Sequence, residues 1–379
     1  MKEPKIRFKG FSGEWEKVKI QDICSKANST HSENSLGENT GNYPIFGANG
    51  YLQNITTFDF NSPYIGIIKD GSGVGRSQLY PAFSSILGTM QYILPKEDIN
   101  ISFLAYLFET IDFSMYINGS SIPHIYFKDY CEQDEYIPSI AEQRAIASYF
   151  QHLDALIQST TKKIESLKQV KAASLQSMFP QEGETTPRVR FKGFEGEWEK
   201  VQFSKLYEPS SIKNKTFGAD KIISVANMYF KPVSYISDEE YLKSYNVMNL
   251  GDIAFEGNKS KNYAHGRFVE NTIGDGIVSH VFIVLKPISK QYDLQFWKYL
   301  INYERIMGPI LLRSTKHSTM MTDLVVSDFL KESVLVPSYE EQKAIGIFLK
   351  TLDRQITLQT QRLEKLKQIK SACLDNMFV

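Results

Sequence analysis

The stretch PSIAEQRAIASYFQHLDALIQSTTKKIESLKQVKAASLQSMFP at residues 138–180 decides the architecture of this chain, because it returns without a gap as PSYEEQKAIGIFLKTLDRQITLQTQRLEKLKQIKSACLDNMFV at residues 337–379. Each copy opens with a serine and, three residues later, a glutamate, which is the capping box of a helix start. Apolar residues then recur at spacings of four and three, a pattern typical of a coiled-coil seam. The seam residues are Ile146, Phe150, Leu153, Ile157, Ile164 and Leu167 in the first copy, and Ile345, Leu349, Leu352, Ile356, Leu363 and Leu366 in the second. One amphipathic helix cannot bury such a stripe alone, so we expect the two helices to pack on each other.

A second repeated segment precedes each of these helices. RFKGFSGEWEKV at residues 7–18 matches RFKGFEGEWEKV at residues 190–201 at all but one position. Between the repeated segments lie 119 residues in the first copy and 135 in the second, with little similarity. The chain is therefore two copies of a constant start, a variable middle and a constant end. We interpret the constant start as a structural clasp, with Phe8, Phe11 and Trp15 packed on the helix ends.

The short linker between the copies predicts the direction of the helices. The first helix carries the chain away from the first globule, and the second copy begins a few residues later, so the second helix has to run back antiparallel with the chain termini close together. The variable middles contain short apolar and aromatic runs punctuated by Gly, Asn, Asp and Pro, which predicts β-rich globules. The expected fold class is α+β, with two β-rich domains, a long antiparallel two-helix coiled coil and an internal pseudo-two-fold repeat. The expected parts are a first domain at 1–137, a helix at 138–180, a linker at 181–187, a second domain at 188–336 and a helix at 337–379.

Composition limits the class of protein. No apolar run reaches the roughly 18 residues of a membrane span, and the start MKEPKIRFKG lacks the apolar core of a signal peptide, which favours the cytoplasm and no membrane partner. Cys24, Cys131 and Cys373 show no metal or disulfide spacing. Lysine plus arginine equals aspartate plus glutamate at 43 each, but residues 19–137 carry 6 basic against 13 acidic side chains. Any DNA-binding role has to accommodate this acidic first middle.

Sequence patterns for catalysis are weak. KDGSGVGR at residues 69–76 lacks the spacing of a nucleotide cradle and predicts a tight turn between strands. NSPY at residues 61–64 resembles the Asn-Pro-Pro-Tyr loop of adenine methyltransferases but departs at its second position, so a methyltransferase remains a minor alternative. The six histidines show no metal-ligand spacing, and we expect no catalytic residue, no metal site and no cofactor of this chain's own.

Polar loops fit binding better, because Lys and Arg suit phosphates and guanine edges while Asn suits adenine. The second middle contains EGNKSKNYAHGRF at 256–268 and RSTKHSTM at 313–320, and the first contains the glycine turn and NGSSIPHIYFK at 118–128. The candidate DNA-binding residues are Lys69, Arg76, Ser120, Ser121 and His124 in the first middle, and Asn258, Lys259, Lys261, Asn262, Arg267, Arg313, Lys316 and His317 in the second.

Over its whole length the sequence resembles a specificity subunit of a type I restriction-modification enzyme. The resemblance rests on F-x-G-F-x-G-E-W at the start of each half, the turn KDGSGVGR, the stretch SSIPHIYFKD and the P-S-x-x-E-Q helix starts. It implies that each middle is a target recognition domain reading one half of a bipartite, asymmetric site in double-stranded DNA, and that the helix pair sets the gap. It also implies a non-catalytic role beside two modification (methyltransferase) subunits and motor-nuclease restriction subunits, which hold the methyl donor, ATP and Mg. A protein-binding scaffold without a direct DNA role is the alternative.

Overall fold

The computed structural model describes residues 3–232, 239–317 and 321–379. The chain forms two compact units, one of residues 1–162 with 361–379 and the other of residues 163–360. We call them unit 1 and unit 2. Each unit contains one variable middle and parts of both long helices.

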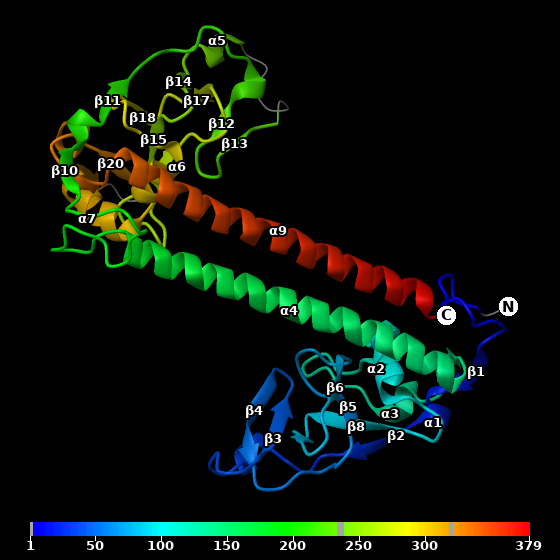
Figure 1. Cartoon of the computed structure of the whole chain (residues 1–379). Helices are drawn as coiled ribbons and strands as arrows, with labels where there is room; N and C mark the ends of the chain where they lie inside the picture. The colour runs from blue at the N-terminus through cyan, green and yellow to red at the C-terminus, as the bar shows by residue number, and fades with distance from the viewer. Residues whose placement is uncertain (1–2, 233–238, 318–320) are drawn as a thin grey trace. The chain divides into compact units, whose positions relative to one another are not determined.

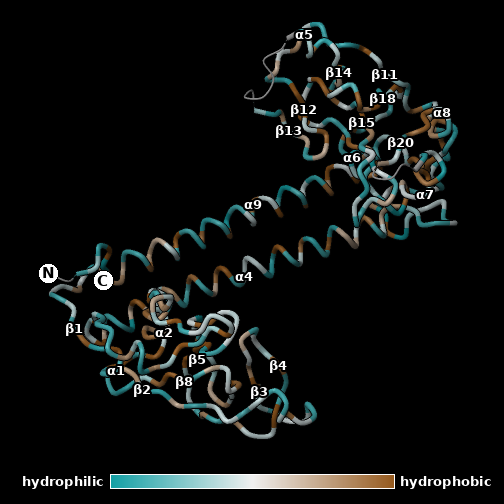
Figure 2. The backbone as a smooth tube through the Cα atoms, turned by 180° about the vertical axis from the view of Figure 1, so that it is seen from behind, coloured by the Kyte–Doolittle hydropathy of each residue, from teal (hydrophilic) through white to brown (hydrophobic). Residues whose placement is uncertain are grey.

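Both repeated segments are helices of the same length. Helix α4 covers Ile140–Met178 and helix α9 covers Tyr339–Met377, 39 residues each (Figure 1). Helix α4 starts in unit 1 and ends in unit 2, whereas α9 starts in unit 2 and ends in unit 1. Apolar positions recur along both helices, as Figure 2 shows by hydropathy.

The two helices pack antiparallel within each unit. In unit 1, the Tyr149 hydroxyl near the start of α4 lies 3.4 Å from the Cys373 Sγ near the end of α9. In unit 2 the order is reversed, and Lys171 Nζ, late in α4, donates to Asp353 Oδ1, early in α9, over 2.6 Å. The antiparallel pairing expected from the short linker is confirmed.

The two variable middles contain the same four-stranded antiparallel sheet despite their different sequences. In unit 1 the strand order is β2 (Cys24–Asn28), β8 (Met90–Pro95), β5 (Tyr64–Ile68) and β6 (Ser77–Tyr80). In unit 2 the order is β11 (Tyr207–Ser210), β18 (Ile283–Pro287), β15 (Ile253–Glu256) and β16 (Arg267–Glu270). A helix follows the second of these strands in each case, α2 (Ile101–Thr110) in unit 1 and α6 (Leu294–Ile301) in unit 2. The internal repeat therefore extends through the middles.

One short strand pair also occurs in both units, and the remaining elements are given for each unit separately. Strand β1 (Glu16–Lys19) pairs with β9 (Asp134–Ile137), and β10 (Glu199–Gln202) pairs with β21 (Ser333–Val336). Unit 1 adds α1 (Ile20–Ile23), β3 (Tyr43–Gly47), β4 (Gly50–Ile55), β7 (Ser85–Ile86) and α3 (Phe127–Tyr130). Unit 2 adds β12 (Ile223–Ser224), β13 (Tyr229–Phe230), α5 (Glu239–Leu242), β14 (Asn246–Met248), β17 (Gly276–Val278), α7 (Glu304–Ser314), β19 (Thr315–His317), β20 (Thr322–Leu324) and α8 (Val326–Phe329).

The repeated starting segment binds the beginning of each long helix through an ion pair. Arg7 donates from Nε and Nη2 to the two carboxylate oxygens of Glu142, both over 2.8 Å. Arg190 binds Glu341 in the same way, over 2.6 and 2.7 Å. The capping box expected from the sequence is therefore confirmed for the serine but not for the glutamate. The serine caps the helix, with Ser139 Oγ 3.4 Å from the Glu142 amide, but the glutamate carboxylate is held by the arginine.

Aromatic residues complete the clasp in both units. In unit 1, the Trp15 ring lies 6.3 Å from that of Phe378, which follows α9. In unit 2, the Trp198 ring lies 6.1 Å from that of Phe179, which follows α4. Phe8 packs on Tyr149 at 5.6 Å, so the structural role expected of Phe8 and Trp15 is confirmed. The helix ends thus belong to the hydrophobic core of the unit in which they finish.

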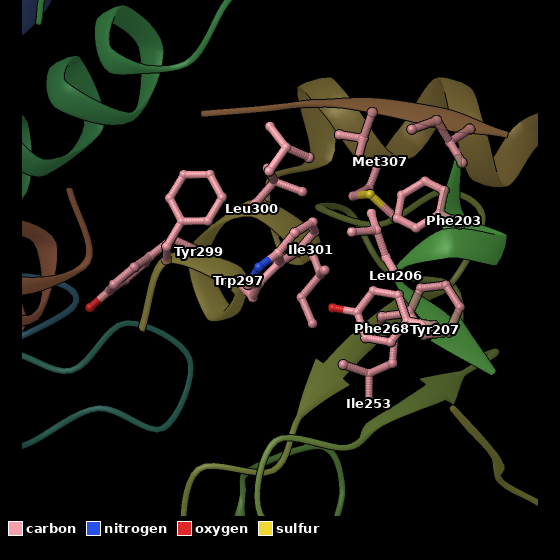
Figure 3. Close-up of a cluster of buried hydrophobic side chains, with 14 of the residues drawn as sticks. Phe203, Leu206, Tyr207, Ile253, Phe268, Trp297, Tyr299, Leu300, Ile301 and Met307 are labelled. Atoms are coloured by element: carbon pink, nitrogen blue, oxygen red, sulfur yellow. The ribbon is translucent and has the colours of Figure 1, made fainter. Parts of the chain in front are cut away.

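The core of unit 2 is rich in aromatic rings. It joins α6, α7 and the four-stranded sheet, and Figure 3 shows Trp297, Leu300 and Met307 facing Phe203, Tyr207 and Phe268. Within the described residues, no helix has the length and apolar character required to cross a membrane.

Candidate DNA-binding surface

In unit 1 the structure brings the two candidate stretches together. The turn of residues 69–76 joins β5 to β6, and the segment 118–125 lies against it. The Gly71 amide donates to the Pro123 carbonyl over 2.8 Å, and the Ile125 amide donates to the Lys69 carbonyl over 2.9 Å. The sequence named these stretches separately, and the backbone hydrogen bonds show that they adjoin.

Glycine is required in this turn for two reasons. Gly71, Gly73 and Gly75 all have φ between +83° and +86°, the left-handed region that side chains rarely adopt. In addition, a Cβ on Gly75 would lie 2.9 Å from the Cβ of the buried Phe113. Glycine therefore lets the turn curl tightly and pass close to Phe113.

The side chains on this surface are mostly neutral donors. Arg76, Ser120 and Ser121 are exposed, while Lys69 and His124 are half-buried. Lys69 Nζ lies 3.9 Å from Asp70 Oδ2, and the His124 ring lies 5.0 Å from the Tyr126 ring. One exposed arginine with two hydroxyl groups suits contacts to phosphates or base edges.

In unit 2 the corresponding loop joins β15 to β16 and lies beside β20. The Thr322 amide donates to the Gly257 carbonyl over 2.9 Å, and Asn258 forms a bridge with Met321. Asn258, Lys259, Lys261 and Asn262 are exposed on this loop, and Lys316 is exposed on β19. Residues 318–320 of the candidate stretch and the side chain of His317 lie outside the described part of the chain.

The two remaining arginines of the candidate set are engaged within unit 2. Arg313, on the last turn of α7, donates to both carboxylate oxygens of Glu332 over 2.9 and 2.7 Å. It lines a cavity of about 730 Å³ that is bounded by the linker residues 180–184. Arg267 Nε donates to Glu256 Oε2 across the strand pair over 2.7 Å. A contact to DNA from either arginine would have to share the guanidinium with its carboxylate.

Part of the acidic charge of the first middle is neutralised inside unit 1. Lys17 pairs with Asp134 on β9 over 2.6 Å, and Lys19 pairs with Glu132 in the turn before β9. Glu109 accepts from Lys370 Nζ over 3.0 Å. These carboxylates therefore repel a DNA backbone less than the net charge of the segment indicates.

The methyltransferase alternative does not fit the position of Tyr64. This tyrosine of the NSPY stretch is buried at the start of β5, and its hydroxyl lies 2.7 Å from Ser84 Oγ. Its ring cannot stack on a nucleotide base. The described residues also contain no group of three or more His, Cys, Asp or Glu side chains placed to hold a metal ion.

The candidates chosen from the sequence omit one hairpin tip in each unit, beside Arg76 in unit 1 and beside Arg267 in unit 2. In unit 1, Arg76 Nη2 lies 3.4 Å from the Ala48 carbonyl oxygen, at the tip between β3 and β4. In unit 2, Arg267 Nη2 donates to the Ala226 carbonyl over 2.8 Å, at the tip between β12 and β13. The signal in the sequence was an Ala-Asn-x-Tyr match at 48–51 and 226–229, too short to notice without the contacts.

Comparison with known proteins gives one consistent result. The sequence matches the family described as type I restriction modification DNA specificity domain twice, over residues 12–169 and 197–368. A curated relative, the type I restriction enzyme MjaVIII specificity subunit of Methanocaldococcus jannaschii, is 22% identical over 403 residues, covering 96% of this chain and 91% of the relative. The crystal structure of a type I restriction-modification system S subunit from M. genitalium has a TM-score of 0.67 at 15% identity, covering 100% of this chain and 99% of that one. A chain from a structural study of assembly and conformational transition in the type I restriction-modification system has a TM-score of 0.50 at 12% identity, covering 96% and 97%. With most of its length matched by that family in two consecutive copies, this chain belongs to the type I restriction-modification DNA specificity family, as a DNA-recognition subunit without a catalytic role.

Proposed function

We propose that each unit reads one half of a bipartite, asymmetric sequence in double-stranded DNA. The observation that carries this proposal is the contrast between scaffold and loops. The two units share their strand order and their helix clasps, whereas the loops at the same end of the sheet, 69–76 and 257–266, differ in length and sequence. A shared frame with different loops is suited to reading two different half-sites.

The residues that we propose for DNA contact lie on these two loops and on the segments 118–125 and 315–317. In unit 1 they are Arg76, Ser120 and Ser121, with Lys69 and His124 beside them, and in unit 2 they are Asn258, Lys259, Lys261, Asn262 and Lys316. Arg267, Arg313 and His317 are also proposed contacts. The guanidinium groups of Arg267 and Arg313 already bind carboxylates within unit 2.

We propose that the helix pair acts as a spacer between the half-sites. Each helix runs for 39 residues, about 58 Å at 1.5 Å per residue, and the Lys171–Asp353 and Lys370–Asp154 pairs hold the two helices in one register. A stiff helix pair would fix the number of base pairs between the halves of the target.

The proposed partners are two modification subunits and the motor-nuclease restriction subunits of a type I complex, acting in the cytoplasm. They would supply the methyl donor, ATP and Mg, and would transfer methyl groups to adenine N6. The family membership and the specificity-subunit name of the relative from M. jannaschii support this assignment.

Because the first middle is acidic, we propose that the partner subunits provide much of the grip on the DNA backbone. The isolated chain should bind DNA weakly, and its complex with modification subunits should bind tightly and in a salt-sensitive manner. A gel-shift titration that gives nanomolar affinity for the isolated chain would contradict this proposal.

The decisive experiment maps methylated adenines in DNA from cells that carry this chain with its modification subunits. The wild type should give one asymmetric target with two specific halves. The double variants S120A/S121A and N258A/N262A should each relax one half and leave the other unchanged. A target that relaxes in both halves with either variant would refute the assignment of one half-site to each unit.

A matched lysine pair tests the loop surface of unit 2. Lys261 lies in the loop after β15, while Lys290 is an exposed lysine that follows β18, at the opposite end of the same sheet. With the assembled modification complex, K261A should lower the slope of log K against log salt by about 0.9, the value for one phosphate contact. K290A should leave the slope unchanged, and equal effects of the two variants would exclude the proposed surface.

A further inference from the structure

The two hairpin tips beside the DNA-binding loops share a sequence pattern, a cross-strand spacing and an arginine contact. Residues 48–51 are Ala-Asn-Gly-Tyr and residues 226–229 are Ala-Asn-Met-Tyr. Across the hairpin, Tyr51 pairs with Phe46 and Tyr229 pairs with Ser224, so each tyrosine has its partner five residues back. In both units an arginine at the end of the DNA-binding loop contacts the carbonyl of the alanine.

The third residue of each tip has a positive φ, which is costly in unit 2. The third residue has positive φ in both, +107° at Gly50 and +49° at Met228. Glycine adopts this conformation freely, but a methionine does so rarely, and such strain persists where the surroundings or the function require it. Unit 2 therefore keeps a positive φ at this position although its residue is not glycine.

The shared tip presents an asparagine and a tyrosine to solvent. Asn49 and Asn227 are exposed, and neither side chain makes a hydrogen bond to any residue that the structure describes. Tyr51 is 56% exposed and Tyr229 is 47% exposed. Each tip thus places an asparagine amide, without a side-chain hydrogen bond among the described residues, near the guanidinium group of Arg76 or Arg267.

We propose that Asn49 and Asn227 bind the sugar-phosphate backbone of the two half-sites and so position the DNA-binding loops over the bases. This inference rests on the proposed function. An element that is the same in two domains which read different sequences suits a feature that both half-sites share, and the phosphate backbone is such a feature. Asparagine side chains commonly contact phosphates, and the adjacent Arg76 or Arg267 adds positive charge.

In addition to their proposed DNA contacts, Arg76 and Arg267 position the tips. Each lies at the junction of the DNA-binding loop and the next strand, and holds the tip through the alanine carbonyl. In unit 1, where the first middle is short of basic side chains, a neutral amide donor supplies backbone contact without further positive charge.

The test measures DNA binding by the assembled modification complex containing N49A, N227A or both. The probes are the cognate duplex, duplexes with one changed base pair at each specific position, and an unrelated duplex. Each single variant should weaken binding to all specific duplexes by the same factor, about 5- to 20-fold, with the discrimination between base pairs unchanged. The factors of the double variant should multiply, because the two tips lie in different units.

A charged variant separates backbone contact from base contact. N49D should weaken binding more than N49A does, uniformly across the probes, because a carboxylate repels phosphate. If Asn49 instead read an adenine, N49D would shift the preference at one base pair towards cytosine, and N49A would lose discrimination at that pair. Either outcome, or full affinity in N49A and N227A, overturns the proposal.

The control is N42A. Asn42 is an exposed asparagine at the other end of β3, about 16 Å along the strand from the tip, and its replacement should leave affinity unchanged. Equal thermal unfolding curves for all variants would show that the fold is intact. A wild-type complex without any sequence preference would refute the proposed function itself, which is distinct from a failure of the tip assignment.

Discussion

Replacing Arg190 by alanine should destabilise unit 2 by about 2–4 kcal/mol. The guanidinium makes charge-assisted hydrogen bonds of 2.6 and 2.7 Å to Glu341, whose side chain is only 1% exposed. Removing one partner of a buried ion pair typically costs about 3–5 kcal/mol, because the other charge stays buried without compensation. The first turn of α9 offsets about 0.3–1 kcal/mol of this, since a helix N-terminus favours a carboxylate.

The assay is urea unfolding followed by tryptophan fluorescence and circular dichroism. The matched control is R188A, two residues away, because Arg188 pairs with Glu184 at the surface with side-chain exposures of 61% and 30%. That variant should cost below about 1 kcal/mol. The double variant R190M/E341L removes both charges and should regain most of the loss. Equal costs for R190A and R188A, or a double variant as unstable as R190A, would refute the buried ion pair as the basis of the clasp.

Three further predictions concern the cores and the helix pair. F378A should lower the unfolding free energy of unit 1 by about 3 kcal/mol in chemical denaturation, because Phe378 is buried beside Trp15 and Phe103. D353K should weaken the helix pair, and the charge reversal K171D/D353K should recover stability beyond the sum of the single variants, as measured by a double-mutant cycle. Burial raises the pKa of the Glu270 carboxyl in the folded protein well above its value in the unfolded chain. The protonated carboxyl therefore stabilises the fold at low pH, and this stabilisation is lost as the pH rises from the unfolded pKa through the folded pKa. E270Q should therefore flatten the decline in melting temperature towards alkaline pH, and an unchanged profile would contradict the assignment.

The elements with strong periodicity were predictable from the sequence. The heptad spacing and the Ser-x-x-Glu starts located both long helices, and the run PYIGII gave β5 while LQFWKYLIN gave α6. The antiparallel direction followed from the short linker alone. Local pattern was sufficient there because each element repeats one physical signal over many residues.

Contacts between distant residues were not predictable in the same way. A glutamate three residues after a helix cap is normally assigned to the cap, yet Glu142 and Glu341 bind arginines 135 and 151 residues earlier. The stretches 69–76 and 118–128 were both proposed for DNA binding, but only the backbone hydrogen bonds between them show one surface. The hairpin tips escaped notice because four residues shared between two divergent middles carry no periodicity.

The placement of Phe179 and Phe378 has a consequence for synthesis on the ribosome. The core of unit 2 includes Phe179, which is synthesised before the second variable middle, whereas the core of unit 1 includes Phe378, near the end of α9. Unit 1, whose variable middle is translated first, should thus be the last to complete its hydrophobic core. Until then Trp15, Phe103 and Phe150 lack their cover, and a nascent chain that stops early would expose them to chaperones and proteases.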